Sequence, residues 1–246
     1  RLSSAGVPSG DEIVVNTNTG SGARARLACG KDRCVIVWTE ENAETPEVYA
    51  RAYDVAGSAL SPPVRVSAAG GRASTPDVAY NGSADQYLVI WTEEHTLTGL
   101  DIKGERLSNN LSPVGAPINV SVASGDQDRA RIAYGRLSNC YCVVWQDKRS
   151  GTNWDVYAQI LSSTGGLQGV SLPLYAGRDN DGEPAVAARD NEDQFLVSFG
   201  ADQFSFMREG YPCIRACTIT GAGAVSAAFD VRRAEANRRW SPAIAH

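Results

Sequence analysis

The stretch Tyr141-Cys-Val-Val-Trp145-Gln-Asp147 decides the fold, because the chain contains four related copies of it. The other copies are CVIVWTE at 34–40, YLVIWTE at 87–93 and FLVSFGA at 195–201. One large aromatic residue recurs in the copies at spacings of 53, 54 and 54 residues: Trp38, Trp91, Trp145 and Phe199. An internal repeat of this length predicts a modular architecture in which each repeat forms one structural unit.

Three further segments recur around each copy. A segment such as Arg131-Ile-Ala133 precedes the copy, and a fifth example of this segment lies near the end of the chain, at 242–245. An alternating segment such as Asp155-Val-Tyr-Ala158 follows the copy, and a short apolar segment such as Ile118-Asn-Val-Ser121 comes last. Turn residues such as Asn81-Gly82 separate the segments. Each repeat is therefore predicted to form four short strands, A to D, and no helix.

Four strands in a repeat of about 54 residues are typical of a β-propeller blade. We therefore predict an all-β fold: a single β-propeller domain over residues 1–246, with four-stranded antiparallel blades. Four blades are complete, and the two ends of the chain supply parts of a fifth. The predicted units are the C-strand end and D strand of a split blade at 1–22, full blades at 23–72, 73–126, 127–180 and 181–236, and the A strand of the split blade at 237–246.

The split blade lacks its two middle strands, which correspond to the 25 residues 81–105 of a full repeat. Three explanations are open. The chain is a fragment of a larger propeller, or a five-bladed ring without one hairpin, or a ring completed by another chain or segment. The sequence begins at Arg1 and not at Met, which suggests a processed or excised piece.

The repeat also resembles a known family. Val143-Val-Trp-Gln-Asp147-Lys-Arg149-Ser-Gly151, followed by Asp155-Val-Tyr-Ala158, is similar to the long-repeat β-propellers of secreted bacterial proteins. The blades of that family combine P-x-V-A-Y, Y-L-V-V-W-x-D-x-R-x-G and D-I-Y-A segments, and the pattern is distantly similar to TolB-like propellers. The resemblance covers nearly the whole chain and is weakest in the last full blade. It implies extracytoplasmic binding or scaffolding and supplies no catalytic residues.

Composition narrows the possible partners. The chain has 28 acidic and 23 basic residues, for a formal net charge of −5, which argues against general binding to nucleic acid or anionic membranes. No apolar run approaches the roughly 18 residues of a membrane span. There are only two histidines, His95 and His246, so histidine-based catalysis and histidine-rich metal sites are disfavoured.

The six cysteines give a further indication. Cys29 and Cys34 flank a short turn between two predicted strands, where facing positions suit a disulfide. The alternative is two buried thiols, since free cysteine packs as a small hydrophobic residue. Cys213 or Cys217 could meet Cys142 on a neighbouring element. Cysteine usage therefore favours an extracytoplasmic or secreted location.

In a propeller, the D-to-A and B-to-C connections share one face, and here they are rich in acidic residues. Convergent carboxylates there would bind a cation or a carbohydrate, whereas the alternative is solvated turns. No cofactor is predicted except a possible calcium ion, held by Asp179, Asp181 and Glu183. The candidate ligand-binding residues, including two tryptophans outside the aligned strands, are Glu41, Glu94, Asp126, Asp147, Arg149, Trp154, Asp179, Asp181 and Trp240.

These features lead to a main functional interpretation and two alternatives. The main interpretation is a non-enzymatic extracellular module for binding, adhesion or scaffolding, which recognises a protein or a carbohydrate. The first alternative is a propeller glycoside hydrolase or lyase, with catalytic carboxylates at the channel mouth drawn from Glu183, Asp202 and Glu209. The second alternative is a structural subunit whose open blade is filled by a strand from a partner.

Overall fold

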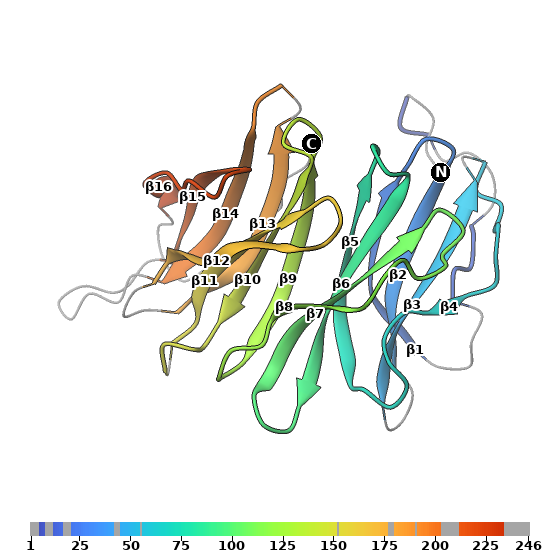
Figure 1. Cartoon of the computed structure of the whole chain (residues 1–246), viewed down its shortest axis with the longest axis horizontal. Coiled ribbons are helices and arrows are strands. Elements are labelled where there is room, and N and C mark those ends of the chain that lie inside the picture. The colour runs from blue at the N-terminus through green and yellow to red at the C-terminus, as the bar shows by residue number, and fades with distance from the viewer. Residues whose placement is uncertain are drawn as a thin grey trace.

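The computed structural model describes residues 5–7, 12–16, 21–41, 45–54, 56–151, 153–176, 180–189, 191–202 and 212–233. Over these residues the chain forms four antiparallel sheets of four strands each, as Figure 1 shows. None of the described residues belongs to a helix that is long and apolar enough to cross a membrane. The predicted all-β propeller of four-stranded blades is confirmed.

Each blade follows the chain order of its strands. Blade one contains β1 (Ser21–Cys29), β2 (Arg33–Glu41), β3 (Pro46–Asp54) and β4 (Val64–Arg65). Blade two contains β5 (Ala73–Asn81), β6 (Gln86–His95), β7 (Gly99–Ser108) and β8 (Ile118–Ser121). Blade three contains β9 (Gln127–Gly135), β10 (Cys140–Asp147), β11 (Asp155–Ser162) and β12 (Leu167–Tyr175). Blade four contains β13 (Asp181–Arg189), β14 (Gln194–Asp202), β15 (Pro212–Thr220) and β16 (Phe229–Arg233).

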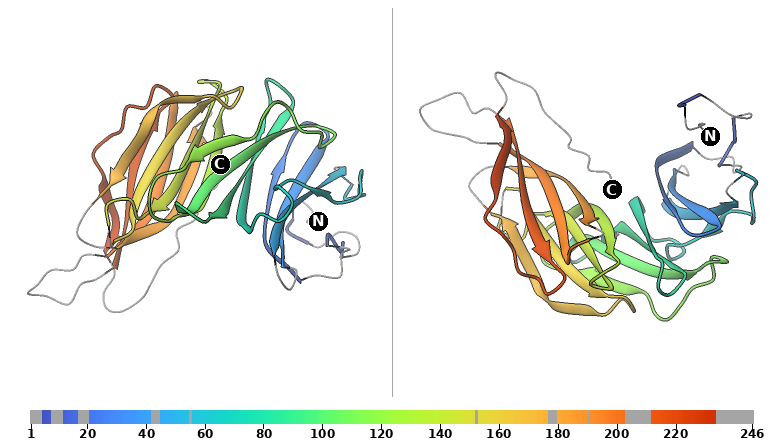
Figure 2. Two further views of the ribbon diagram at one scale, coloured as in Figure 1. Left: turned by 60° about the horizontal axis from the view of Figure 1, so that its bottom comes forward. Right: turned by 90° about the horizontal axis from the view of Figure 1, so that it is seen from above.

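The four sheets fan out along an arc, which the right-hand view of Figure 2 shows from above. The first strands of the blades, β1, β5, β9 and β13, lie next to one another along the inside of this arc. The core fills the spaces between neighbouring sheets. The second strands are covered on both faces, and all eight residues of β10 are buried, which explains their continuous apolar character.

An indole–carboxylate hydrogen bond recurs in the first three blades, buried in blades one and three and partly buried in blade two. The indole Nε1–H of Trp38 donates to Glu40 at 2.8 Å, that of Trp91 to Glu93 at 3.1 Å, and that of Trp145 to Asp147 at 2.7 Å. Blade four has Phe199 and Ala201 at the two equivalent positions, both buried. Donor and acceptor are replaced together because either one left alone in the core would lose its hydrogen bond.

The predicted disulfide between Cys29 and Cys34 is present. The two residues face each other in the pairing of β1 with β2, at the turn that joins the strands. The other cysteines, Cys140, Cys142, Cys213 and Cys217, are free and buried.

The split blade differs from expectation where the chain can be described. Residues 12–16, within the predicted D strand of that blade, form no strand. They lie instead against blade one, where the Val15 carbonyl accepts a hydrogen bond from Arg51 and Asn16 donates to Glu40. A D strand needs a C strand as its partner, and no strand among the described residues pairs with residues 12–16. The predicted A strand at 237–246 lies outside the described residues.

Candidate functional site

Each inner strand carries a β-bulge at the same place in the repeat. The pairing register shifts there in β1, β5, β9 and β13. The bulge residues are Arg24, Thr75, Arg129 and Glu183, whose φ angles are 55°, 51°, 56° and 51°. Positive φ is uncommon for residues other than glycine, and bulges redirect side chains. All four residues line one hollow of about 270 Å³ on the inside of the arc.

A larger cavity of about 1130 Å³ runs along the same inner strands. The residues two positions beyond each bulge, Arg26, Asp77, Arg131 and Ala185, line it. The bulge positions form one row of equivalent residues, and the positions two residues beyond form a second row. Together the two rows place charged side chains from neighbouring blades around adjoining spaces. Because the backbone is alike in the four strands, the differences between the rows lie in the side chains.

The carboxyl groups of this cavity have different surroundings. Glu183 forms an ion pair with Arg129 from the neighbouring inner strand. Asp77 is buried, and its two oxygens accept hydrogen bonds from the backbone N–H groups of Val78 at 2.9 Å and Ile132 at 3.1 Å. Burial raises the pKa of Asp77 above its usual value, and the nearby positive charge of Arg131 partly offsets this effect.

A third carboxylate ties blades two and three together beside the bulges. Asp128 accepts hydrogen bonds from the hydroxyls of Thr75 at 3.3 Å and Thr92 at 3.0 Å, and from the backbone N–H of Arg129 at 2.7 Å. These contacts hold the bulge residues of β5 and β9 at a fixed separation. Asp128 therefore positions Thr75 and Arg129.

Of the residues predicted from the sequence, Glu183 lines this cavity, whereas Glu94 lies near the end of β6 and Asp126 lies in the connection before β9. Glu94 pairs with Arg72 at 2.6 Å. Asp126 accepts a hydrogen bond from the Leu100 N–H at 3.3 Å. Each contact therefore links a connection to a strand of blade two.

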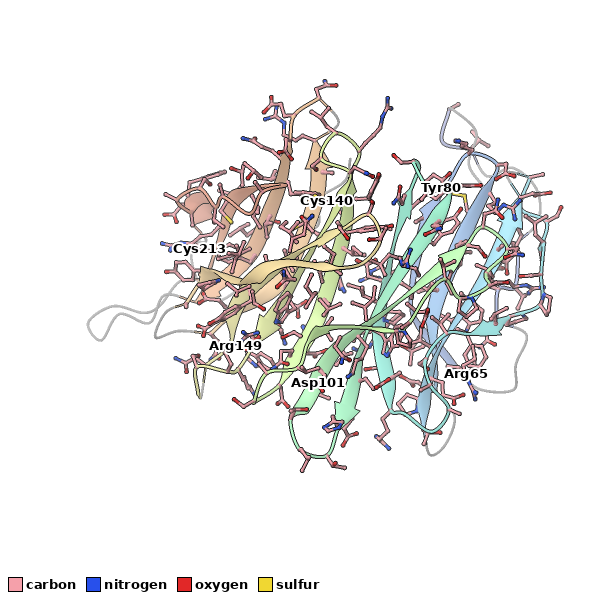
Figure 3. All side chains as sticks on the ribbon, in the orientation of Figure 1. Arg65, Tyr80, Asp101, Cys140, Arg149 and Cys213 are labelled. Atoms are coloured by element: carbon pink, nitrogen blue, oxygen red, sulfur yellow. A yellow bond between two sulfur atoms is a disulfide. The ribbon has the colours of Figure 1, made fainter. Side chains whose placement is uncertain are left out.

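Asp147 and Arg149 bind each other on the predicted face of acidic connections, where Figure 3 labels Arg149 near the lower side of the molecule. The Arg149 guanidinium binds Asp147 at 2.6 and 2.9 Å, and it also lies over the ring of Tyr157. Since Asp147 also accepts the Trp145 indole hydrogen bond, both of its oxygens are engaged by blade three.

The remaining predicted residues do not gather in the cavity. Trp154 lies under the Lys148 ammonium at 4.4 Å, Glu41 is exposed at the end of β2, and Asp181 is buried at the start of β13. Asp202 ends β14, and its side chain is not described. Asp179, Glu209 and Trp240 lie outside the described residues. Within the described residues, no group of three or more His, Cys, Asp or Glu side chains is arranged to hold a metal ion, so the calcium site stays a prediction.

The sequence analysis does not identify five charged residues of the cavity and the adjoining hollow: Arg24, Arg26, Asp77, Arg129 and Arg131. Three of these, Arg26, Asp77 and Arg131, belong to the segments that recur before each copy, which predict only strands. Their signal was variation among otherwise equivalent positions: the row two residues beyond the bulge contains two arginines, an aspartate and an alanine. Such variation on the strand that lines a propeller channel is informative, since the fold alone does not require it.

Comparisons with known proteins place this fold among solved structures. No protein-family model matches the sequence, and no curated protein matches it. Among solved structures, an α-L-arabinanase from Penicillium chrysogenum complexed with arabinobiose is 10% identical, with a TM-score of 0.57 over 83% of this chain and 66% of that one. An endo-arabinase from Bacteroides thetaiotaomicron is 16% identical, with a TM-score of 0.55 over 82% and 78%. The catalytic domain of a GH62 α-L-arabinofuranosidase from Coprinopsis cinerea is 13% identical, with a TM-score of 0.52 over 87% and 70%.

These comparisons overturn the main functional interpretation of the sequence. The three solved structures named above are an arabinanase, an endo-arabinase and an arabinofuranosidase, and they favour the enzymatic alternative over a non-enzymatic module for binding, adhesion or scaffolding. That interpretation relied on near-equivalent blades. The first three blades share the Trp–carboxylate pair. The blades differ along the channel, where Asp77 and Glu183 each occur in one blade only.

Proposed function

We propose that this chain is the propeller of a glycoside hydrolase that cleaves a polysaccharide in its central cavity. The observation that carries the proposal is that Asp77 and Glu183, from different blades, line one cavity of about 1130 Å³. Glycosidic cleavage requires two carboxyl groups on opposite sides of the scissile bond. A polysaccharide substrate also fits an extracytoplasmic protein that contains the Cys29–Cys34 disulfide.

The surroundings of the two carboxyl groups suggest different roles for them. A general acid must hold its proton near neutral pH, and burial moves the pKa of Asp77 in that direction. Asp77 would donate this proton to the leaving-group oxygen. Glu183 forms an ion pair with Arg129. It would act on the other side of the bond, as the base that takes a proton from the attacking water or as the nucleophile.

The proposal is tested by sugar release from a panel of arabinan, arabinoxylan, xylan and pectic polysaccharides. Removing an acid or base is expected to lower the turnover rate by about 10²–10⁴-fold, so Asp77→Asn and Glu183→Gln should both lose activity. Glu192→Gln is the matched control, because Glu192 pairs with Arg189 in the same blade and does not line the cavity. A Glu183→Gln variant as active as the control, or a wild-type protein that releases no sugar from any polysaccharide, would refute the proposal.

A further inference from the structure

The charge of the cavity is opposite to that of the protein. The whole chain has a formal net charge of −5. Among the described residues, two acidic side chains line the cavity and its adjoining hollow, Asp77 and Glu183, against six basic ones. The basic residues are Arg24, Arg26, Lys31, Arg129, Arg131 and Arg136. A low-dielectric concave wall focuses such a field and attracts an anion.

Most of this positive charge is not neutralised within the described part of the chain. Arg129 pairs with Glu183, whereas Arg24, Arg26 and Arg131 form no ion pair with a described residue. Arg26 and Arg131 each donate a hydrogen bond to the carbonyl of the preceding residue, at 3.0 and 2.8 Å. Five donors on each guanidinium leave further N–H groups available for a ligand.

The arginines also lie close enough to repel one another. Burial is the main cause that lowers the pKa of Arg131, the carboxylate of Asp77 acts against it, and the positive charges of Arg26 and Arg129 lower the pKa further. Holding like charges together in a partly buried place costs free energy. A bound anion would remove this cost, so the arrangement favours an anionic ligand.

We propose that the cavity binds an acidic sugar residue, with its carboxylate or sulfate held by Arg26 and Arg131. This proposal rests on the proposed function and names the substrate class of that site. The planar guanidinium binds a carboxylate or sulfate through two parallel hydrogen bonds, which gives orientation as well as attraction. Tyr80 and Tyr134 line the same cavity and present apolar rings with polar hydroxyls, a combination suited to a sugar ring.

The shape and overall charge of the protein favour an acidic saccharide over nucleic acid. Nucleic-acid binding uses a basic footprint on an exposed surface. Here four of the basic residues, Arg24, Arg26, Arg129 and Arg131, lie on inner strands, and Lys31 and Arg136 lie in the turns that follow β1 and β9. They line a concave space in a chain that is acidic overall. A short anionic oligosaccharide can enter such a cavity while an acidic exterior remains in solvent.

Binding is tested on the whole chain by isothermal titration calorimetry with four probes: trigalacturonate, a sulfated trisaccharide, neutral arabinotriose and a pentaglutamate peptide. An acidic saccharide is expected to bind at least about tenfold more tightly than arabinotriose, and more weakly at about 0.5 M NaCl than at about 0.05 M. The stronger of the two acidic saccharides identifies the anionic group. Equal binding of arabinotriose, or equally tight binding of pentaglutamate, would overturn the proposal.

Two arginine variants connect binding to the cavity. Arg131→Gln and Arg26→Gln are each expected to weaken binding of the acidic saccharide by about 10–100-fold, since each removes charge-assisted hydrogen bonds. Arg189→Gln is the control, because this exposed arginine lies at the end of β13 and does not line the cavity. Arg26 is exposed, and among the described residues its side chain hydrogen-bonds only the Ala25 carbonyl. Arg26→Gln is therefore expected to leave the fold intact even if Arg131→Gln does not. Unchanged binding in Arg26→Gln contradicts the inference.

The two proposals fail in different ways. If the wild-type protein cleaves neutral arabinan but binds no acidic saccharide, the acidic-sugar site is refuted and the hydrolase proposal stands. If it binds the acidic saccharide in an arginine-dependent manner but cleaves no polysaccharide, the hydrolase proposal is refuted and the binding site stands.

Discussion

Replacing Asp147 by alanine is expected to destabilise the protein by about 3–5 kcal/mol, the cost of removing one partner of a buried ion pair. Asp147 is fully buried, and it accepts hydrogen bonds from the Trp145 indole, the Arg149 backbone and the Arg149 guanidinium at 2.6–2.9 Å. The substitution leaves the Trp145 N–H without its acceptor in the core. It also leaves Arg149, whose side chain is 25% exposed, without its carboxylate.

A double-mutant cycle isolates the indole–carboxylate contact. Trp145→Phe combined with Asp147→Ala reproduces the Phe199 and Ala201 pair that blade four carries naturally. Once the acceptor is absent, loss of the donor N–H no longer costs a hydrogen bond. The double variant should therefore be less destabilised than the sum of the two single variants, by about 1.5–3 kcal/mol, as for a hydrogen bond to a charged group.

Urea unfolding followed by circular dichroism measures these differences, provided that the denaturant slopes agree among the variants. The matched control cycle combines Trp145→Phe with Glu93→Gln, because Glu93 accepts from Trp91 in another blade. That control should be additive to within about 0.5 kcal/mol. If the Trp145–Asp147 cycle is equally additive, the indole–carboxylate bond does not explain the paired replacement in blade four.

Two further predictions follow from burial. Because burial raises the pKa of Asp77 in the folded protein, the stability gained from its protonated form is complete below the ordinary carboxyl pKa of about 4 and is lost as pH rises through the raised value. The wild type should therefore lose free energy of unfolding relative to Asp77→Asn over that range, and parallel pH curves would contradict the reasoning. Burial also raises the pKa of Cys217 to about 11 and that of Cys142 well above its usual value, so Ellman's reagent at about pH 8 should label these thiols slowly in the native protein and rapidly in urea. Equal labelling rates would show that the two thiols are accessible in the folded chain.

The blades could be predicted from the sequence because the repeat is imposed by packing. The second strand of each blade lies between two layers of side chains, so it must be apolar throughout, as all eight buried residues of β10 illustrate. The disulfide between Cys29 and Cys34 could also be predicted, since a hairpin turn brings facing residues within bonding range. Both are local requirements that recur wherever the same structure recurs.

The strand predicted for the split blade is absent at residues 12–16, because a strand also needs a partner. Its sequence resembles the other D strands, but a strand at this position depends on a partner strand. No strand among the described residues pairs with residues 12–16, which bond to blade one through Val15 and Asn16 instead. Sequence similarity to a strand therefore predicts a strand only where the pairing edge is also present.

The candidate site was hard to predict because its geometry depends on a bulge that the sequence does not mark. Arg24, Thr75, Arg129 and Glu183 share one backbone conformation but have no side-chain property in common. The acidic residues of the predicted connections favour a ligand site only because they are numerous. Yet Glu94 pairs with Arg72, Asp126 accepts from the Leu100 backbone, and Asp147 accepts from the Trp145 indole. A carboxylate in a connection is more often used by the fold than by a ligand.

In a repeat protein, equivalent positions of the repeats can be compared with one another. The comparison is informative where these positions have the same backbone conformation. The four bulges have φ angles within a few degrees of one another, so the backbone requirement at these positions is the same in every blade. Equivalent positions elsewhere in the repeat have similar side chains in several blades, as the Trp–carboxylate pairs of the second strands do in three blades, and packing explains this similarity. The four bulge positions, in contrast, have arginine, threonine, arginine and glutamate around one hollow, and packing does not explain this difference. Selection for a ligand does explain such change, because a bound molecule presents a different group to each blade, and this is why the inner-strand arginines and Glu183 are the residues to test first.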